Sequence, residues 1–305
     1  MTEKLETTSG SNGFTSVDLL LIVMTIFWAI NPVVIKMAEE QFNLWAFVGL
    51  RNALASLSFI VLMMFTEKKM TVKKEDWARV IALSLVGATG VQICFLSGYK
   101  YTTASNGTLI FATTPLFIAI ISRILGLEKI SLRGWGGIFL SLLGTFLLVS
   151  KDLSASNMSG SFFGDMLMLI AAILWASNSL MVAPLLKEYS PILITGLTTI
   201  IGTIPLFIFA LPSIFNQSWG AVNIKGWGGL VFSSIFAMLV TNIIWNIGVQ
   251  KVGSVKTSLY QNVKPFITIW IVVIFFNETF SAVMFFGGLM ILGGLVVGRT
   301  APSAK

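Results

Sequence analysis

The sequence predicts an all-α integral membrane protein of ten transmembrane helices, arranged as a 5+5 inverted-topology repeat with both termini in the cytoplasm. Three observations lead to this prediction: the composition, ten long apolar runs, and a register of matched residues between the two halves. Of the 305 residues, 55% are hydrophobic and 11% are charged, whereas about a quarter of residues in soluble domains are charged. This composition excludes a soluble enzyme, a nucleic-acid-binding protein and a secreted disulfide-stabilised domain.

Ten apolar runs are long enough to cross a bilayer, which takes about 20 apolar residues in a helix. Helices are predicted rather than barrel strands, because the apolar residues are continuous and do not alternate with polar ones. We expect the transmembrane helices at residues 17–38, 44–65, 77–97, 103–122, 132–149, 163–184, 191–211, 226–248, 255–276 and 281–298.

The basic residues are distributed unevenly between alternate connecting segments. With the N-terminus placed inside, 14 of the 20 Lys and Arg residues fall in inner segments and 4 in outer segments, while Arg51 and Lys264 lie within spans. Cytoplasmic loops carry an excess of Lys and Arg, so both termini are predicted to be cytoplasmic. This distribution accounts for the net charge of +7, and no nucleic-acid partner is expected. The polar first 16 residues argue against a cleavable signal peptide.

The two halves of the chain match in a consistent register. Trp28-Ala29-x-Asn31 is repeated 147 residues later as Trp175-Ala176-x-Asn178. After a three-residue insertion the offset is 150, and it pairs Trp77 with Trp227, Gly98 with Gly248, Pro115 with Pro265, Glu128 with Glu278, Ser131 with Ser281, Gly137 with Gly287 and Gly144 with Gly294. Each half has five spans, so the second half must enter the membrane from the opposite side. Such inverted repeats are characteristic of secondary transporters, whose substrate site lies near the midplane. A duplicated bundle without transport is the alternative.

The register divides the chain into five parts. We expect a disordered cytoplasmic tail at 1–16, a first repeat at 17–149, a linker at 150–162, a second repeat at 163–298 and a cytoplasmic tail at 299–305. Several matched residues have structural roles that need no substrate. The Ser pair can cap helices, the Gly pairs permit close helix packing, and the Pro pair is expected to kink its helices.

Lys264 is the clearest candidate for a binding residue. It lies about nine residues into the ninth span, so roughly 14 Å deep at 1.5 Å per residue. A charged side chain at this depth requires a partner or a wet cavity. Lys264 therefore has a substrate or gating role, or it is a structural lysine that binds carbonyls freed by Pro265. Tyr260 is four residues earlier and shares its helix face.

Further polar and aromatic side chains lie within the spans and are candidates for a cavity lining. Arg51 either faces this cavity or extends to the outer interface, and each Asn either binds substrate or bonds across helices. Pro32 is expected to break the first helix directly after Asn31. The complete set of predicted substrate-binding residues is Trp28, Asn31, Arg51, Gln92, Tyr99, Asn106, Trp175, Asn178, Tyr260 and Lys264.

The residue types that are missing also limit the function. The chain has no His and only one Cys, Cys94, so no catalytic residue, metal site or cofactor is predicted. No Asp or Glu lies deep within a predicted span. Asp18, for example, lies near a helix start. Proton or sodium coupling through a buried carboxylate is therefore not expected. Facilitated diffusion, exchange and coupling through Lys264 stay open.

The motif residues carry a family resemblance. Pro115, followed by Glu128-Lys129-Ile130-Ser131 and spaced glycines, resembles the EamA repeat, as does Phe27-Trp28-Ala29-Ile30-Asn31-Pro32. The chain resembles a ten-helix EamA-type member of the drug/metabolite transporter superfamily over about residues 17–298. This resemblance implies a 5+5 bundle with a central cavity, and export or exchange of small metabolites across a bacterial inner membrane.

The sequence therefore predicts a multi-pass secondary transporter that exports or exchanges small solutes through alternating access. The fixed positive charge of Lys264 within a span favours a carboxylate-bearing solute. Amino acids and their relatives are the leading candidates. A phosphorylated-metabolite or organic-anion antiporter is the alternative, and it requires Arg51 as a second cation. An integral membrane enzyme and a membrane scaffold are less favoured. The expected partners are a small-molecule substrate and the lipid bilayer, and a homodimer is left open.

Overall fold

The structure of the protein, a computed structural model, describes residues 14–102, 104–155, 162–267, 270 and 282–302. All secondary-structure elements in these residues are helical. Within the described ranges, seven helices are long and apolar enough to cross a membrane: Ser16–Ile35, Leu44–Thr66, Lys74–Tyr101, Gly107–Ile124, Phe162–Leu185, Pro191–Phe215 and Ile224–Val252. Shorter apolar helices cover Leu132–Leu148 and Phe285–Arg299. The chain is therefore a multi-pass membrane protein whose described part is all-helical.

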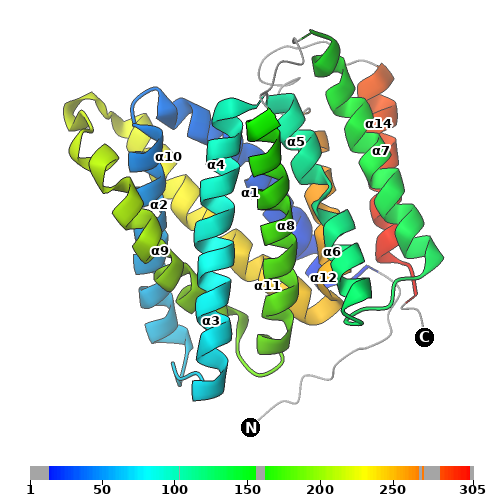
Figure 1. Cartoon of the computed structure of the whole chain (residues 1–305), viewed down its shortest axis with the longest axis horizontal. Coiled ribbons are helices and arrows are strands. Elements are labelled where there is room, and N and C mark those ends of the chain that lie inside the picture. The colour runs from blue at the N-terminus through cyan, green and yellow to red at the C-terminus, as the bar shows by residue number, and fades with distance from the viewer. Residues whose placement is uncertain (1–13, 103, 156–161, 268–269, 271–281, 303–305) are drawn as a thin grey trace.

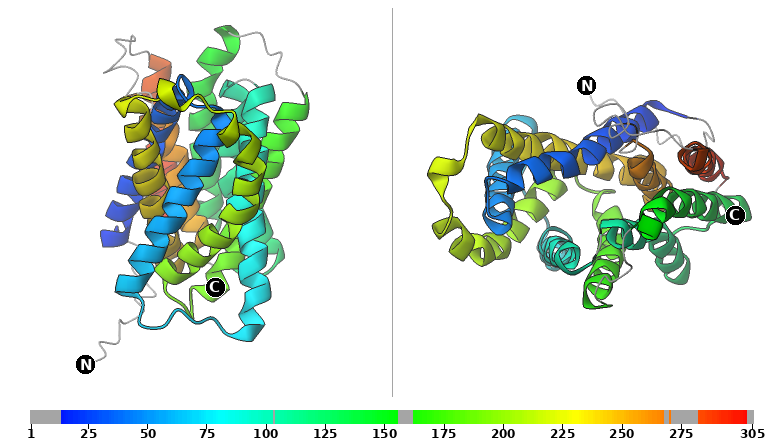
Figure 2. Two further views of the ribbon diagram at one scale, coloured as in Figure 1. Left: turned by 90° about the vertical axis from the view of Figure 1, so that its left-hand side faces the viewer. Right: turned by 90° about the horizontal axis from the view of Figure 1, so that it is seen from above.

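The helices form one upright bundle (Figure 1, Figure 2). Its elements are α1 (Ser16–Glu39), α2 (Leu44–Thr66), η1 (Lys74–Asp76), α3 (Trp77–Leu83), η2 (Ser84–Val91), α4 (Gln92–Tyr101), α5 (Ala104–Ala112), α6 (Thr114–Ile124), α7 (Leu132–Ala155), α8 (Phe162–Leu185), α9 (Pro191–Phe215), η3 (Trp219–Ala221), α10 (Ile224–Ser234), η4 (Ile235–Val240), α11 (Thr241–Val252), α12 (Ser254–Ser258), η5 (Leu259–Asn262) and α14 (Ala282–Arg299).

Side chains before the first turns define several helix starts. Asn43 Oδ1 accepts the backbone N–H of Trp45, at 3.1 Å, at the start of α2. Ser190 Oγ accepts the N–H of Leu193 at 3.0 Å before α9. Such caps satisfy N–H groups that have no partner within the helix. The capping role expected for Ser131 is confirmed, because its hydroxyl accepts the N–H of Gly134 at 3.2 Å.

Proline residues act differently in two helices. The break expected at Pro32 is wrong, because α1 continues through this residue to Glu39. By contrast, the chain is interrupted at Thr113 between α5 and α6, and Pro115 lies in the first turn of α6. Pro115 has no N–H for the carbonyl of Phe111, and the hydroxyl of Thr114 donates to that carbonyl at 2.5 Å. A local hydroxyl thus satisfies the acceptor that the proline leaves free.

Two of the long crossing helices contain a π-helical segment. These segments are η2, between α3 and α4, and η4, between α10 and α11. The hydroxyl of Ser84, at the start of η2, donates to Val80 O at 2.7 Å. Ser234, directly before η4, donates in the same way to Leu230 O at 2.7 Å. π-Helical turns are rare in proteins, and those that occur often lie at functional sites. Both segments are followed by polar residues, Gln92 and Thr241.

α7 and α14 lie side by side at one edge of the bundle (Figure 1). The expectation that the Gly pairs permit close packing is confirmed here. A Cβ atom at Gly137 would lie 2.5 Å from the backbone nitrogen of Gly298, and one at Gly144 would lie 2.6 Å from Gly287 O. The two backbones are therefore in direct contact. α7 itself continues to Ala155, which is inside the segment expected to be a linker.

One end of the bundle, which we call the basic end, carries the loops 67–73, 125–131 and 186–190 (Figure 1). Lys73 Nζ pairs with Glu188 at 2.5 Å, and Tyr189 donates its hydroxyl to Asp76 at 2.7 Å. At the opposite end, Gln217 Oε1 accepts the N–H of Asn43 at 2.6 Å, and Gln41 Oε1 accepts the N–H of Asn223 at 2.9 Å. Segments distant in sequence are therefore joined at both ends of the bundle.

Candidate functional site

Three tryptophan residues from different helices form a cluster inside the bundle, which we call the tryptophan cluster. Trp28 lies at the middle of α1, Trp175 in α8 and Trp245 in α11. The ring centroids are 6.0 Å apart for Trp28 and Trp175, 5.7 Å for Trp28 and Trp245, and 5.5 Å for Trp175 and Trp245. Two predicted site residues are thus brought together, and they are joined by a tryptophan that the prediction did not include.

Lys264 lies against this cluster. Its Nζ atom is 5.1 Å from the ring centroid of Trp28 and 5.5 Å from that of Phe111. These contacts are cation–π interactions, in which the ammonium faces the negative face of the ring. None of the salt bridges among the described residues involves Lys264. The side chain therefore has aromatic neighbours but no counter-charge in the described part of the chain.

The indole N–H groups of the cluster also have no acceptor. The Nε1 atoms of Trp175 and Trp245 are buried, and neither has a hydrogen-bond partner among the described residues. Buried donors of this kind are uncommon in proteins and require an explanation, such as a bound molecule. Together with the ammonium of Lys264, they make this part of the bundle a group of hydrogen-bond donors without acceptors.

A second polar group, which we call the arginine cluster, comprises Arg51, Asn52, Gln92, Ser233 and Asn31. Arg51 Nη2 donates to Gln92 Oε1 at 2.5 Å, and its Nη1 lies 3.4 Å from Ser233 Oγ. Gln92 Nε2 donates to Asn52 Oδ1 at 2.8 Å, and Ser233 Oγ donates to Asn31 Oδ1 at 2.8 Å.

These contacts place the guanidinium inside the bundle rather than at the outer interface. Its Nε atom is buried and has no acceptor among the described residues. All neighbours of Arg51 in this cluster are neutral. The guanidinium is therefore a second cation without a counter-charge in the described part of the chain.

The tryptophan and arginine clusters adjoin along α1. Trp28 belongs to the first cluster and Asn31 to the second, and three residues in a helix span about 4.5 Å along its axis. The same pair of residues appeared in the sequence as one matched motif. Lys264 thus contacts one turn of α1 directly, and Arg51 is linked to the next through the hydroxyl of Ser233.

The remaining predicted site residues occupy other surroundings. Tyr99 packs edge-on against Phe95, with a centroid distance of 4.8 Å, and its hydroxyl lies 3.4 Å from Thr108 Oγ1. Asn178 lies against η2, where a Cβ atom at Gly87 would be 2.6 Å from its Cγ. The side chain of Asn106 lies outside the described residues.

Tyr260 is fully buried and takes part in a different interaction. Its hydroxyl donates to Asp18, which also accepts Arg299 Nε at 2.5 Å and Arg299 Nη2 at 2.9 Å. Asp18 is 1% exposed. The view of Asp18 as an ordinary residue near a helix start is therefore incomplete, because it is a buried carboxylate in an ion pair. Sequence patterns did not reveal this, since an acidic residue in the third helical position normally completes a capping box, as Asp18 also does with Thr15.

The loop residue Glu128 links the two halves of the chain at the basic end. Its carboxylate accepts the N–H of Ser254 at 2.8 Å, and also that of Val255. Gly253 next to it has a φ of +87°, which is favourable only for glycine. Burial raises the pKa of Glu128 above its ordinary value, and the two backbone hydrogen bonds oppose this shift. Glu128 thus caps the helix start that leads to Tyr260 and Lys264.

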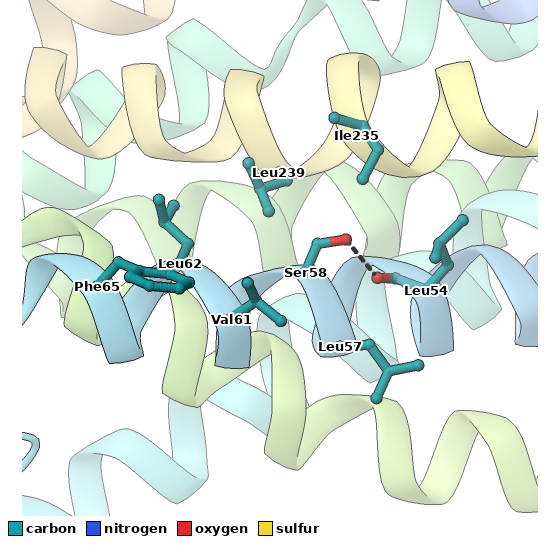
Figure 3. A pocket seen from close by; sticks show the side chains of 8 residues that line it. All are labelled: Leu54, Leu57, Ser58, Val61, Leu62, Phe65, Ile235 and Leu239. Atoms are coloured by element: carbon teal, nitrogen blue, oxygen red, sulfur yellow. Dashed lines mark hydrogen bonds between the residues drawn. The ribbon is translucent and has the colours of Figure 1, made fainter.

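Two hollows lie away from these clusters. One, of about 530 Å³, is lined by Leu54, Leu57, Ser58, Val61, Leu62, Phe65, Ile235 and Leu239, and it is almost entirely apolar (Figure 3). The other, of about 440 Å³, is lined by Phe42, Asn43, Leu44, Trp45 and Lys100. Neither contains a predicted site residue, and no group of metal-ligating side chains occurs among the described residues.

Several members of the two clusters are not among the predicted site residues. Asn52, Ser233 and Phe111 touch Arg51, Gln92 or Lys264 but were not predicted. Asn52 is adjacent to Arg51 within a span, which is a sequence feature that could have identified it. Ser233 and Phe111 are ordinary residues of apolar helices, and no sequence feature distinguishes them.

The comparisons with known proteins agree on one family. The model of the EamA-like transporter family matches residues 15–150 and again residues 162–298. The uncharacterized transporter YyaM of Bacillus subtilis is 26% identical over 259 residues, covering 83% of this chain and 84% of its own. An uncharacterized transporter of Archaeoglobus fulgidus is 26% identical over 91% of this chain and 95% of its own.

A plant protein and a solved structure extend the comparison. The WAT1-related protein At3g02690, chloroplastic, of Arabidopsis thaliana is 25% identical over 93% of this chain and 69% of its own. One protein crystal structure superposes with a TM-score of 0.77 at 15% identity, covering 93% of this chain and 96% of that one. At this identity the structural match indicates a shared fold only.

Proposed function

The chain belongs to the EamA-like transporter family, and from this membership we propose that it is a secondary transporter exporting or exchanging small carboxylate-bearing solutes. The observation that carries the proposal is the position of Lys264, whose ammonium lies over Trp28 without a carboxylate partner in the described part of the chain. A positive charge within a membrane bundle is costly and is typical of a substrate pathway. A carboxylate supplied by the substrate would neutralise this charge.

We further propose that the bundle consists of ten crossings in two inverted sets of five, with both termini cytoplasmic. The duplicated match to one family model supports this arrangement. The contacts at the two ends of the bundle support it as well. Lys73 and Glu188 at the basic end correspond, at the offsets of 150 and 147 residues, to Asn223 and Gln41 at the opposite end.

Alternating access then follows from the position of the site between the two sets. The tryptophan cluster combines Trp28 from the first set with Trp175 and Trp245 from the second, so a rocking movement of the two sets would rearrange its rings. The loops that meet at each end would separate in turn. The apolar faces of the indoles would contact the hydrocarbon part of the solute, while Lys264 would hold its carboxylate.

The location that fits this function is the plasma membrane of a bacterium. Bacterial relatives such as YyaM support this placement. Amino acids and organic acids both carry the carboxylate that Lys264 requires. The alternative of a phosphorylated-metabolite or organic-anion antiporter is favoured by one observation, the inward-facing guanidinium of Arg51.

Counterflow in proteoliposomes tests the proposed function. Vesicles containing the purified protein are loaded with one unlabelled amino acid, organic acid or phosphate ester, and uptake of the same labelled solute is measured. We expect accumulation with at least one carboxylate, and a loss of at least tenfold in Lys264→Gln. The matched control is Lys251→Gln, which changes an exposed lysine on α11 and should leave uptake unchanged. Equal uptake by wild type and Lys264→Gln would contradict the role of Lys264.

A further inference from the structure

We propose that the substrate is a small organic anion with two separated anionic groups and no ammonium group, such as a short-chain dicarboxylate. In this arrangement Lys264 and the tryptophan cluster bind one anionic group, and Arg51 binds the other. The inference rests on the proposed transport function and specifies the chemical class of its substrate.

The first argument is charge. Arg51 contacts the amide of Gln92 and the hydroxyl of Ser233, and Lys264 contacts the rings of Trp28 and Phe111. Neither cation forms any of the salt bridges among the described residues. Buried charges in proteins are normally paired, because an uncompensated charge inside the bundle is strongly unfavourable. Two unpaired cations therefore call for two negative charges from a ligand.

The second argument is the supply of hydrogen-bond donors. Arg51 Nε, Trp175 Nε1 and Trp245 Nε1 are all buried without an acceptor among the described residues. These three atoms are donors only. They are distributed over both clusters, one in the arginine cluster and two in the tryptophan cluster. Carboxylate groups accept several hydrogen bonds each, so two carboxylates satisfy both sets of donors.

The third argument is spacing. The clusters adjoin through Trp28 and Asn31, which are one turn apart on α1 and separated by about 4.5 Å along the helix axis. Because the two clusters share no residue, we assign each cation its own anionic group, and a short chain with an anionic group at each end provides both. Between the two ends, the hydrocarbon chain would pass the indole faces.

The fourth argument concerns the ammonium group of amino acids. No carboxylate of the described residues touches either cluster, so neither offers a counter-charge for an ammonium. Two fixed cations would repel it. The face of Trp28 is already occupied by Lys264. Among the described residues, the buried amide oxygens without partners are Gln261 Oε1 and Asn262 Oδ1. They belong to η5, which packs against α14, α7 and α1.

Three solutes with the same number of carbon atoms test this proposal. Glutarate has two carboxylates, glutamate adds an ammonium to the same skeleton, and valerate lacks one carboxylate. Proteoliposomes containing the full-length protein are loaded with each solute, and counterflow of its labelled form is measured. We expect glutarate to be exchanged at least ten times faster than either glutamate or valerate.

Variants separate the two binding positions. Arg51→Gln should reduce glutarate exchange at least tenfold while leaving the weak valerate exchange unchanged, and Lys264→Gln should abolish both. Arg51→Lys should restore part of the glutarate exchange, because it keeps the charge. Quenching of tryptophan fluorescence by glutarate provides a binding readout for variants that are folded but inactive, and Lys251→Gln serves as the control.

Each contrary outcome has a distinct meaning. Exchange of glutamate at the rate of glutarate, or unchanged glutarate exchange in Arg51→Gln, would overturn the two-anion proposal but leave carboxylate transport standing. Exchange of a phosphate ester without glutarate would also overturn it. A folded protein that exchanges none of the carboxylates would contradict both this inference and the proposed function.

Discussion

Asp18 and Arg299, which are 281 residues apart in the sequence, form a buried ion pair between the first and last helices described. Both nitrogen atoms of a guanidinium edge take part, with Nε at 2.5 Å and Nη2 at 2.9 Å from the two carboxylate oxygens. Both side chains are 2% exposed, and Tyr260 donates to the same carboxylate. The pair therefore connects α1, η5 and α14.

Removal of one partner from this pair should destabilise the protein strongly. Asp18→Asn leaves the guanidinium of Arg299 buried without a counter-charge, which costs about 3–5 kcal/mol. The measurement is unfolding in detergent, followed by tryptophan fluorescence. The double variant Asp18→Asn with Arg299→Gln should be more stable than the sum of the two single losses predicts. Strict additivity would show that the pair is not coupled.

Lys264→Gln should have the opposite signature, with lost transport and retained stability. The unpaired ammonium is a destabilising element of the empty protein, so its removal should leave the midpoint of thermal unfolding unchanged or raised. Exchange should fall at least tenfold in the same preparation. A large drop in the unfolding midpoint would instead identify Lys264 as a structural lysine.

Trp245→Phe tests the indole donor without removing the aromatic ring. The substitution deletes the Nε1 group that has no partner among the described residues, so the empty protein should lose little stability. Substrate affinity should fall roughly tenfold or more, since a hydrogen bond to a charged group contributes about 1.5–3 kcal/mol. Trp227→Phe is the control, because Trp227 stacks on Trp219 away from both clusters. Unchanged affinity in Trp245→Phe would exclude this donor from the site.

Gly137→Ala and Gly136→Ala form a matched pair on α7. A Cβ atom at Gly137 would meet the backbone of Gly298 at 2.5 Å, whereas one at Gly136 would meet nothing within 4 Å. The first substitution should destabilise the protein by about 1–3 kcal/mol through overpacking. The second should be neutral or stabilising, because Ala favours helices more than Gly. Equal stability of the two variants would contradict direct contact between α7 and α14.

Glu128 should make the stability of the protein depend on pH. Its pKa is raised above 4.5 in the folded protein, so the folded state binds the proton more tightly than the unfolded state. The resulting stabilisation is fully present below the unfolded value and is lost as the pH rises through the raised folded pKa. Glu128→Gln should remove this dependence. Unfolding midpoints measured from about pH 4 upward will check it, and identical pH profiles for both proteins would contradict the assignment.

Much of the architecture could be predicted from composition and periodicity. Long apolar runs have a strong preference for helices in a membrane, because every backbone group must be hydrogen-bonded within its own segment. Position within a run also identified Lys264 as a residue that needs a special environment. The depth of Pro115 predicted the disturbance between α5 and α6, although the same reasoning was wrong for Pro32.

The candidate site could be predicted only in part. Trp28, Trp175 and Lys264 were identified because they are matched or charged residues within spans. Trp245 lies within a span as well, but nothing in the sequence joins it to the other tryptophans. Its ring reaches them because α1, α8 and α11 pack together, and this packing depends on contacts among residues about 70 to 220 positions apart.

Local chemistry along the chain was thus sufficient to predict that this is a membrane protein, where its helical segments lie and that cations lie inside them. Those properties depend on hydrophobicity and charge within a window of about 20 residues. The partners of those cations were decided by three-dimensional packing. Arg299 meets Asp18 and is neutralised, whereas Arg51 meets only neutral groups among the described residues. No property of either arginine in its own helix distinguishes these outcomes, because each depends on which distant helix faces it.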